Sequence, residues 1–225
     1  MNKSAIEKKI GYVFRDGALL QRAFTHGSAD SSPERNYQRL EFLGDSILGY
    51  TVAEKLLLLH PKAAEGQLTK MRAYVVSEKR LADAVERLGL ADFLIAGDNE
   101  LKSGIQSHDS IRCDLFESVT GAICLDGGAD EAKAFVLRVL ADDIAAAKSK
   151  IKTADAKSNL NEYSMKHGIR IEYRENVSSK DKQGAEFVFT VYADGKPAGK
   201  GSGPSKRAAQ TAAAESALVN LKAKT

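Results

Sequence analysis

Two carboxylates lie inside an otherwise apolar helical run at residues 36–48, NYQRLEFLGDSIL. Glu41 and Asp45 are four residues apart, so on a helix they share one face. Burying even a neutral polar group without a partner costs roughly 2 to 7 kcal/mol, and burying a charge costs more. The pattern therefore predicts that a cation lies against this face of the helix.

A second run, CDLFESVTGAICLD at 113–126, repeats the arrangement with Asp114 and Glu117, which are three residues apart. Two acidic helical faces that offer only oxygen ligands indicate a hard divalent cation such as Mg²⁺. For either pair alone, a solvated helix face or an ion pair with Arg39 or Arg112 also accounts for the carboxylates.

The periodicity of the apolar residues predicts two domains. Residues 1–147 show helical spacing almost throughout, which predicts an all-α domain, with Asn36 capping the helix of the acidic run and His60-Pro61 ending it. Residues 148–154 are rich in charge and lack apolar periodicity, so they predict a short linker. Residues 155–225 predict a small α+β module in the order helix, three strands, helix.

The formal charge is distributed unevenly between these two parts. Residues 1–150 carry 20 Lys and Arg against 22 Asp and Glu, whereas residues 151–225 carry 13 against 8. The first part is therefore −2 and the second +5, which together give the +3 of the whole chain. A basic module beside a nearly neutral domain indicates that the module meets a polyanion.

Several motifs occur in the order typical of one family. The string at 36–48 resembles the signature of the ribonuclease III family. Thr25-His26-Gly27-Ser28 before it, and Glu65-Gly66-Gln67-Leu68-Thr69 after it, are similar to further segments of that family. The run that contains Asp114 and Glu117 follows in the expected place.

The C-terminal module resembles the double-stranded RNA-binding domain. The resemblance depends on the order of its elements and on Gly203-Pro204-Ser205-Lys206-Arg207, which opens the last helix. Together the two resemblances imply an all-α endonuclease domain followed by an α-β-β-β-α RNA-binding domain.

The resemblance implies a homodimeric endonuclease that cuts both strands of double-stranded RNA and leaves 5′-phosphates and short 3′ overhangs in rRNA precursor and mRNA processing. The resemblance also implies that the ion is Mg²⁺, that Mn²⁺ can replace it, and that no small-molecule cofactor is needed. The family assigns metal binding to Glu41, Asp45, Asp114 and Glu117, catalysis to Asp45 and Glu117, and an accessory role to Glu65. Divalent ions held by carboxylates can activate water and help the leaving group.

Gln38 departs from the family, which usually has a glutamate there. An amide offers a metal ion only a neutral oxygen. We expect cleavage to be retained, with altered metal dependence or slower turnover. A protein that binds RNA without cutting it is the alternative that Gln38 keeps open, and a helical structural or RNA-chaperone protein that only dimerises is another.

RNA binding by the module is expected at two places. The N-terminus of the last helix presents free N–H groups and the positive end of the helix dipole, where Lys206 and Arg207 add charge. The resemblance implies that Asn161 and Glu162 contact the minor groove and that Ser205 also binds RNA. Two features depart from the family pattern. Gln210 stands where the general pattern has lysine, and the segment 178–185 supplies charge only through Lys180 and Lys182.

The remaining expectations concern packing and location. Phe42 is expected at the dimer interface, His26 as a packed and hydrogen-bonded residue, and Cys113 and Cys124 as core thiols. The N-terminal residues contain no apolar stretch long enough for a signal peptide, and no window reaches the roughly 20 apolar residues of a membrane span. We therefore expect a cytoplasmic protein without membrane contact.

Overall fold

The computed structural model describes residues 2–154, 156–176 and 187–223, and the chain divides into two compact units, residues 1–147 and 148–225. The expectation for Lys180 and Lys182 concerns a segment outside the described residues. Among the described helices, none is long and apolar enough to cross a membrane.

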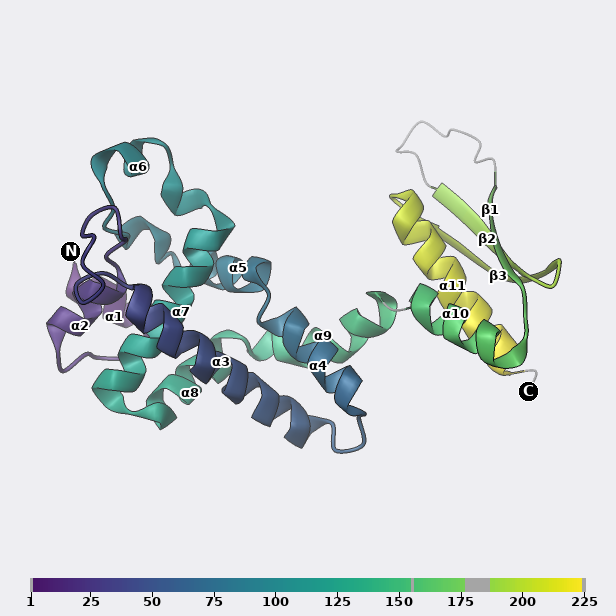
Figure 1. The fold of residues 1–225 in the computed structure, drawn as a ribbon, viewed down its shortest axis with the longest axis horizontal. Helices are drawn as coiled ribbons and strands as arrows, with labels where there is room; N and C mark the ends of the chain where they lie inside the picture. The colour runs from purple at the N-terminus through teal and green to yellow at the C-terminus, as the bar shows by residue number, and fades with distance from the viewer. Residues whose placement is uncertain (1, 155, 177–186, 224–225) are drawn as a thin grey trace. The chain divides into compact units, whose positions relative to one another are not determined.

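The first unit is helical, as predicted (Figure 1). Its elements are α1 (Lys3–Ile10), α2 (Gly17–Ala23), α3 (Gln38–Leu59), α4 (Glu65–Val75), α5 (Glu78–Leu88), η1 (Ala91–Phe93), α6 (Asp98–Lys102), η2 (Ile105–Ser107), α7 (Asp109–Gly127), α8 (Ala129–Val139) and α9 (Ala141–Ala154). The predicted linker 148–154 is the C-terminal part of α9 and is helical rather than irregular. Alanine and lysine have high helix propensity, so the helix continues where no apolar stripe marks it.

Helix α7 is the centre of the first unit. Between Leu115 and Ile123 every residue except Glu117 is buried, as expected for a helix that other helices surround. Helices α2, α3, α5 and α8 all pack against it. Glu117 is therefore a half-buried carboxylate in the most buried stretch of the unit.

Helices α3 and α7 cross with their backbones in contact, and two glycines allow it. A Cβ atom at Gly44 of α3 would lie 1.8 Å from the carbonyl oxygen of Glu117. A Cβ atom at Gly121 of α7 would lie 2.1 Å from the carbonyl oxygen of Leu40. Any larger side chain at either glycine would force the helices apart.

The start of α3 is fixed by the segment that precedes it. The N-cap of α3 is Tyr37 rather than the predicted Asn36, although Asn36 Oδ1 accepts the N–H of Gln38 at 3.0 Å and so still supports the first turn. The N–H of Tyr37 donates to the carbonyl of Thr25 at 2.9 Å, which ties the helix start to the Thr25–Ser28 segment. At the other end, α3 stops at His60, immediately before Pro61.

The second unit has the predicted order of helix, three strands and helix. Its elements are α10 (Ala156–His167), β1 (Ile171–Asn176), β2 (Phe187–Ala193), β3 (Lys196–Gly203) and α11 (Lys206–Lys222). The sheet is antiparallel in the order β1-β2-β3, and Asp194 and Gly195, both with positive φ, form the turn between β2 and β3.

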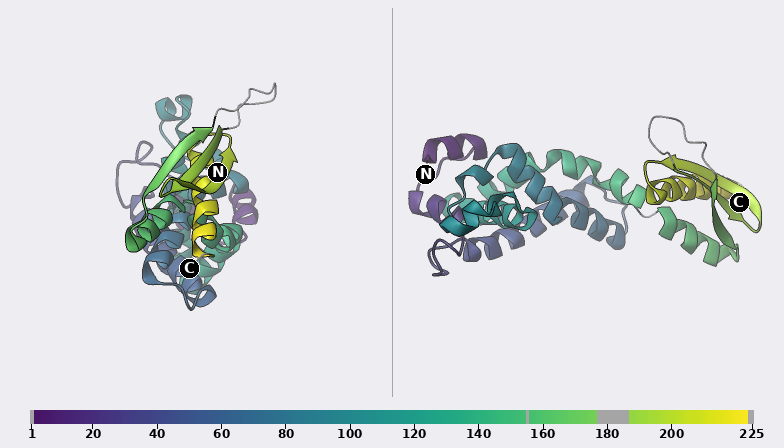
Figure 2. Two further views of the ribbon diagram at one scale, coloured as in Figure 1. Left: turned by 90° about the vertical axis from the view of Figure 1, so that its right-hand side faces the viewer. Right: turned by 90° about the horizontal axis from the view of Figure 1, so that it is seen from above.

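One face of the sheet is covered by α11, and α10 packs against α11 (Figures 1 and 2). The core contains Leu160, Phe189 and Val191 together with small residues of α11, among them Ala213 and Ala217. Gly199 and Gly201 of β3 lie directly against these alanines, because a Cβ atom at either glycine would overlap the backbone of α11. Ala209 and Ala214 of α11 are buried in the same core.

We predict that Gly44→Ala destabilises the helical unit. Its methyl group would overlap the backbone of α7, so the free energy of unfolding should fall by about 3 kcal/mol or more, the upper end of overpacking costs. Urea unfolding followed by circular dichroism measures this change.

Gly17→Ala is the matched control, because a Cβ atom there meets only the end of the Lys3 side chain at 3.8 Å. Its stability should be unchanged or rise by up to about 1 kcal/mol from the better helix former. Equal stability of the two variants would show that the close crossing of α3 and α7 is not required.

Candidate functional site

The crossing of α3 and α7 brings the four predicted carboxylates together. We call Glu41 and Asp45 of α3 and Asp114 and Glu117 of α7 the acidic cluster. Asp45 is exposed, whereas the other three are half-buried. Because the two helices touch at Gly44, which lies between Glu41 and Asp45 in α3, the negative charges act on one another across the crossing.

Repulsion within the acidic cluster changes the acidity of two of its members. Burial, followed by the charges of Asp114 and Asp45, raises the pKa of Glu41 from 4.5 to about 7. Burial, followed by the charges of Asp45, Glu41 and Asp114, raises the pKa of Glu117 to about 7 as well. Both carboxyl groups are therefore poised to release a proton when positive charge arrives.

Asp114 is held by a buried tyrosine. The Tyr37 hydroxyl donates to Asp114 Oδ2 at 3.3 Å, and the tyrosine itself is only 2% exposed. Burial raises the pKa of Asp114, against the smaller lowering effect of this hydrogen bond. The sequence analysis did not identify Tyr37 because no spacing in the sequence connects residue 37 with residue 114.

His26 is packed and hydrogen-bonded, as predicted. Its ring meets Tyr37 edge-on with the centroids 5.6 Å apart, and its Nδ1 accepts the N–H of Ser28 at 3.0 Å. The Ser28 hydroxyl lies 2.7 Å from the same nitrogen. The Thr25–Ser28 segment thus supports the tyrosine that holds Asp114.

Within the described part of the chain, none of the four carboxylates forms an ion pair with lysine or arginine. Arg112, the cation that the sequence offers next to Asp114, instead pairs with Glu86 at 3.1 Å. Arg39 lies close enough to Arg22 and Glu34 to affect their pKa values. The interpretation of the α7 carboxylates as partners of Arg112 is therefore wrong.

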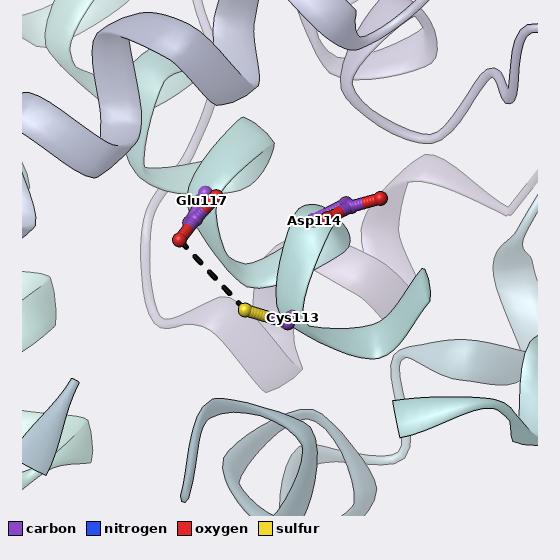
Figure 3. A group of neighbouring side chains, drawn as sticks. All are labelled: Cys113, Asp114 and Glu117. Carbon is purple, nitrogen blue, oxygen red and sulfur yellow. Dashed lines mark hydrogen bonds between the residues drawn. The ribbon is translucent and has the colours of Figure 1, made fainter. Parts of the chain in front are cut away.

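The cysteines are not core thiols in the full sense, because both are half-buried. Cys113 lies at the edge of the acidic cluster, where its Sγ is 3.7 Å from Glu117 Oε1 (Figure 3). Burial, followed by the charge of Glu117, raises the pKa of the Cys113 thiol. In Cys124, burial alone raises the pKa of the thiol.

Two expected members of the site lie outside the acidic cluster. Glu65 is exposed on the first turn of α4 and is not among the charges that raise the pKa of Glu41 or Glu117. It lines a cavity of about 480 Å³ between α3 and α4, together with Tyr50 and Leu57. Gln38 is exposed at the first residue of α3.

Three candidate residues lie at the N-terminus of α11. Ser205 is the N-cap, and its hydroxyl accepts the N–H of Ala208 at 3.2 Å. Lys206 and Arg207 are exposed on the first turn, and the Lys206 ammonium is 2.9 Å from a carboxylate oxygen of Glu175 on β1. A phosphate group that binds here therefore competes with one carboxylate for Lys206.

Helix α10 presents the other expected RNA-binding residues, Asn161 and Glu162, both exposed. The sequence analysis missed Lys157, whose ammonium donates to the side-chain oxygen of Gln210 on α11. Gln210 occupies the position where the general domain pattern has a lysine. Lys157 thus brings positive charge to the side chain of Gln210, a contact that only the folded packing of α10 on α11 creates.

These features define a class of protein: a helical domain with a carboxylate cluster at a helix crossing, joined to a module of the RNA-binding type. Comparison with family models gives the same two parts. Residues 16–144 match the Ribonuclease-III-like family, and residues 156–221 match the double-stranded RNA binding motif. The chain belongs to the ribonuclease III family and is an endonuclease for double-stranded RNA.

Individual relatives support this membership. The chain is 40% identical over 213 residues to Ribonuclease 3 of Symbiobacterium thermophilum, an alignment that covers 93% of this chain and 90% of the relative. It is 37% identical over 218 residues to Ribonuclease 3 of Idiomarina loihiensis, with 96% and 94% covered.

A solved nuclease domain of ribonuclease III from Campylobacter jejuni matches the first unit. The TM-score is 0.60 at 38% identity, and the match covers 63% of this chain and 98% of the solved chain. That structure was described as showing structural flexibility in a region involved in dimer formation.

We predict that, without divalent ions, stability decreases as the pH rises from about 4.5 to about 7. Glu41 and Glu117 have pKa values of about 7 in the folded state against the ordinary 4.5, so the folded state binds more protons in this window. Glu117→Gln removes one of these groups and weakens the repulsion on the other, so its pH-dependent decrease should be smaller.

Urea unfolding in a chelator at several pH values between about 5 and 8 measures the slope. Glu131→Gln, at an exposed glutamate of α8, is the control and should keep the slope of the unmodified protein. Identical slopes for Glu117→Gln and the unmodified protein would contradict the assigned repulsion.

Proposed function

We propose that the protein is a homodimeric, Mg²⁺-dependent endoribonuclease that cleaves both strands of double-stranded RNA and leaves 5′-phosphates and short 3′ overhangs. The observation that carries this proposal is the acidic cluster, four carboxylates from two touching helices without a lysine or arginine partner among the described residues. Processing of rRNA precursors and mRNA in the cytoplasm is the role that we assign to it.

The acidic cluster suits a hard divalent ion. Its ligands are carboxylate oxygens, which Mg²⁺ and Mn²⁺ prefer, and the raised pKa values of Glu41 and Glu117 express a need for positive charge. A bound Mg²⁺ ion would supply the positive charge that phosphodiester hydrolysis requires. Glu41, Asp45, Asp114 and Glu117 would hold it.

We assign catalytic roles to Asp45 and Glu117. Asp45 is the exposed member of the cluster and therefore faces incoming RNA and water. The backbone carbonyl of Glu117 touches Gly44, so the helix crossing fixes the backbone position of Glu117. Tyr37 keeps the Asp114 carboxylate oriented through its hydrogen bond.

The second unit supplies binding to the RNA duplex. Double-stranded RNA is recognised largely by its shape, through phosphates and 2′-hydroxyls. The N-terminus of α11 with Ser205, Lys206 and Arg207 suits phosphates, and the exposed Asn161 and Glu162 of α10 suit the minor groove.

Homodimer formation is supported by the apolar surface of α3. Phe42 is 78% exposed, and Tyr50, Leu57 and Leu58 are also exposed along the same helix. The cavity between α3 and α4 offers an apolar recess at the far end of that surface. A two-fold pairing of α3 helices would bring each Phe42 to the cavity of the other chain.

This pairing gives Glu65 an accessory role that a single chain does not explain. Glu65 lines the same cavity, and Glu41 precedes Phe42 in α3. If Phe42 enters the cavity, then Glu65 of the partner subunit approaches the acidic cluster. Because Gln38 at the start of α3 is neutral, this site carries less negative charge than in family members that have a glutamate there.

The central test is incubation with a long, end-labelled RNA duplex in Mg²⁺ and, separately, in Ca²⁺. We expect Mg²⁺-dependent fragments with 5′-phosphates, and their loss in Glu117→Gln because a carboxylate of the cluster is removed. RNA that the unmodified protein binds but does not cut would contradict the proposal, favour the non-cleaving alternative and point to Gln38 as the cause.

We predict that Phe42→Glu weakens the dimer, because it replaces an exposed aromatic ring at the proposed two-fold contact with a charge. The dissociation constant should rise at least about thirtyfold, as for removal of an interface hot spot. Sedimentation equilibrium measures it.

Met165→Glu is the control, since Met165 is 83% exposed on α10 and belongs to no proposed interface of the nuclease domain. It should leave the dissociation constant unchanged. Equal association of the unmodified protein and Phe42→Glu would exclude the proposed pairing of α3.

A further inference from the structure

Cys113 gives the acidic cluster a type of ligand that its four carboxylates lack. The Cys113 Sγ atom lies 3.7 Å from Glu117 Oε1, one turn further along α7 (Figure 3). With Asp114, these residues offer one sulfur and two oxygen ligand atoms, all within 4.8 Å of one another. Three such atoms in one turn of a helix form a set that a single ion can bind.

The spacing suits an ion that accepts both sulfur and oxygen. Zn²⁺ binds thiolate at about 2.3 Å and carboxylate at about 2.0 to 2.2 Å, which puts the sulfur and oxygen about 3.6 Å apart on a tetrahedral ion. The 3.7 Å between Cys113 Sγ and Glu117 Oε1 is close to this value. Mg²⁺ differs, because it prefers oxygen ligands and octahedral geometry.

The surroundings of Cys113 also favour a cation. The charges that act on its thiol belong to Glu117, Asp114 and Glu78, and all three are negative. The neighbouring Arg112 pairs with a carboxylate of α5 instead. Cys113 and both cluster carboxylates are half-buried, so an ion can reach them from solvent.

We propose that Cys113, Asp114 and Glu117 form a site for a soft divalent cation of the Zn²⁺ class, and that its occupation blocks nuclease activity. Binding replaces the S–H bond of Cys113 with a sulfur–metal bond, the proton leaves to solvent, and water takes the fourth position. Two of the three ligands belong to the acidic cluster, so a soft ion and Mg²⁺ compete for them. The inhibition rests on the proposed function, whereas the site itself does not.

The site is tested by adding Cd²⁺ to the metal-free full-length protein and recording the ultraviolet charge-transfer band of a cadmium–thiolate bond. The band should saturate at one Cd²⁺ per chain in the unmodified protein and in the control Cys124→Ser, and it should be absent in Cys113→Ser. A band that persists in Cys113→Ser, or that never forms in the unmodified protein, overturns the site.

Glu117→Gln separates a three-residue site from binding to the thiol alone. The affinity for Cd²⁺ should fall by at least roughly tenfold, since even residues that only orient a metal ligand contribute this much. An unchanged affinity would overturn the assignment of Glu117 as a ligand.

The inhibition is tested by adding Zn²⁺ to the RNA cleavage reaction at fixed Mg²⁺, with each variant compared with its own rate without Zn²⁺. Half-inhibition should need at least roughly tenfold more Zn²⁺ in Cys113→Ser, and the same concentration in Cys124→Ser. Equal inhibition of all three proteins overturns the proposal. A cadmium band in a protein that cuts no RNA would support the site and overturn the proposed function.

Discussion

The backbone contact between α3 and α7 is the constraint on which the site depends. Gly44 and Gly121 let the two helices approach until a carbonyl of each lies where a Cβ atom of the other would be. At this separation, the carboxylates of α3 and α7 beside the contact act on one another electrostatically. The same contact fixes the backbone of Glu117 in the buried centre of the unit. Packing and chemistry are therefore set by one feature of the fold.

That arrangement opposes stability and favours metal binding. The acidic cluster brings together four carboxylates, and burial and mutual repulsion raise the pKa of Glu41 and Glu117 to about 7. Arg112, which could neutralise part of the negative charge of the acidic cluster, pairs with Glu86 instead. Positive charge from a bound ion would relieve the repulsion between the carboxylates, so the folded state would be more stable with the ion bound. The buried Tyr37 holds Asp114 through a hydrogen bond, and the half-buried His26 packs against the Tyr37 ring.

The sequence predicts much of this because its strongest signals are local. The helical spacing of apolar residues predicted the helices of the first unit, and carboxylates three or four residues apart predicted the two acidic faces. The change from helical spacing to alternation predicted the order of helix, strands and helix in the second unit. Local signals cannot reveal contacts between distant segments, so the hydrogen bond from Tyr37 to Asp114 and the packing of Lys157 on Gln210 were missed. The helical continuation through 148–154 was missed because propensity alone, without an apolar stripe, maintains it.

The account claims that α3 and α7 together form one divalent-ion site. Anomalous diffraction from a crystal of the full-length protein soaked in Mn²⁺ tests this claim most directly, because it locates the ion without reference to activity. We predict a peak bounded by carboxylate oxygens from both helices, including Glu41 and Glu117. A peak bounded by one helix alone, or no peak within the acidic cluster, would contradict the account.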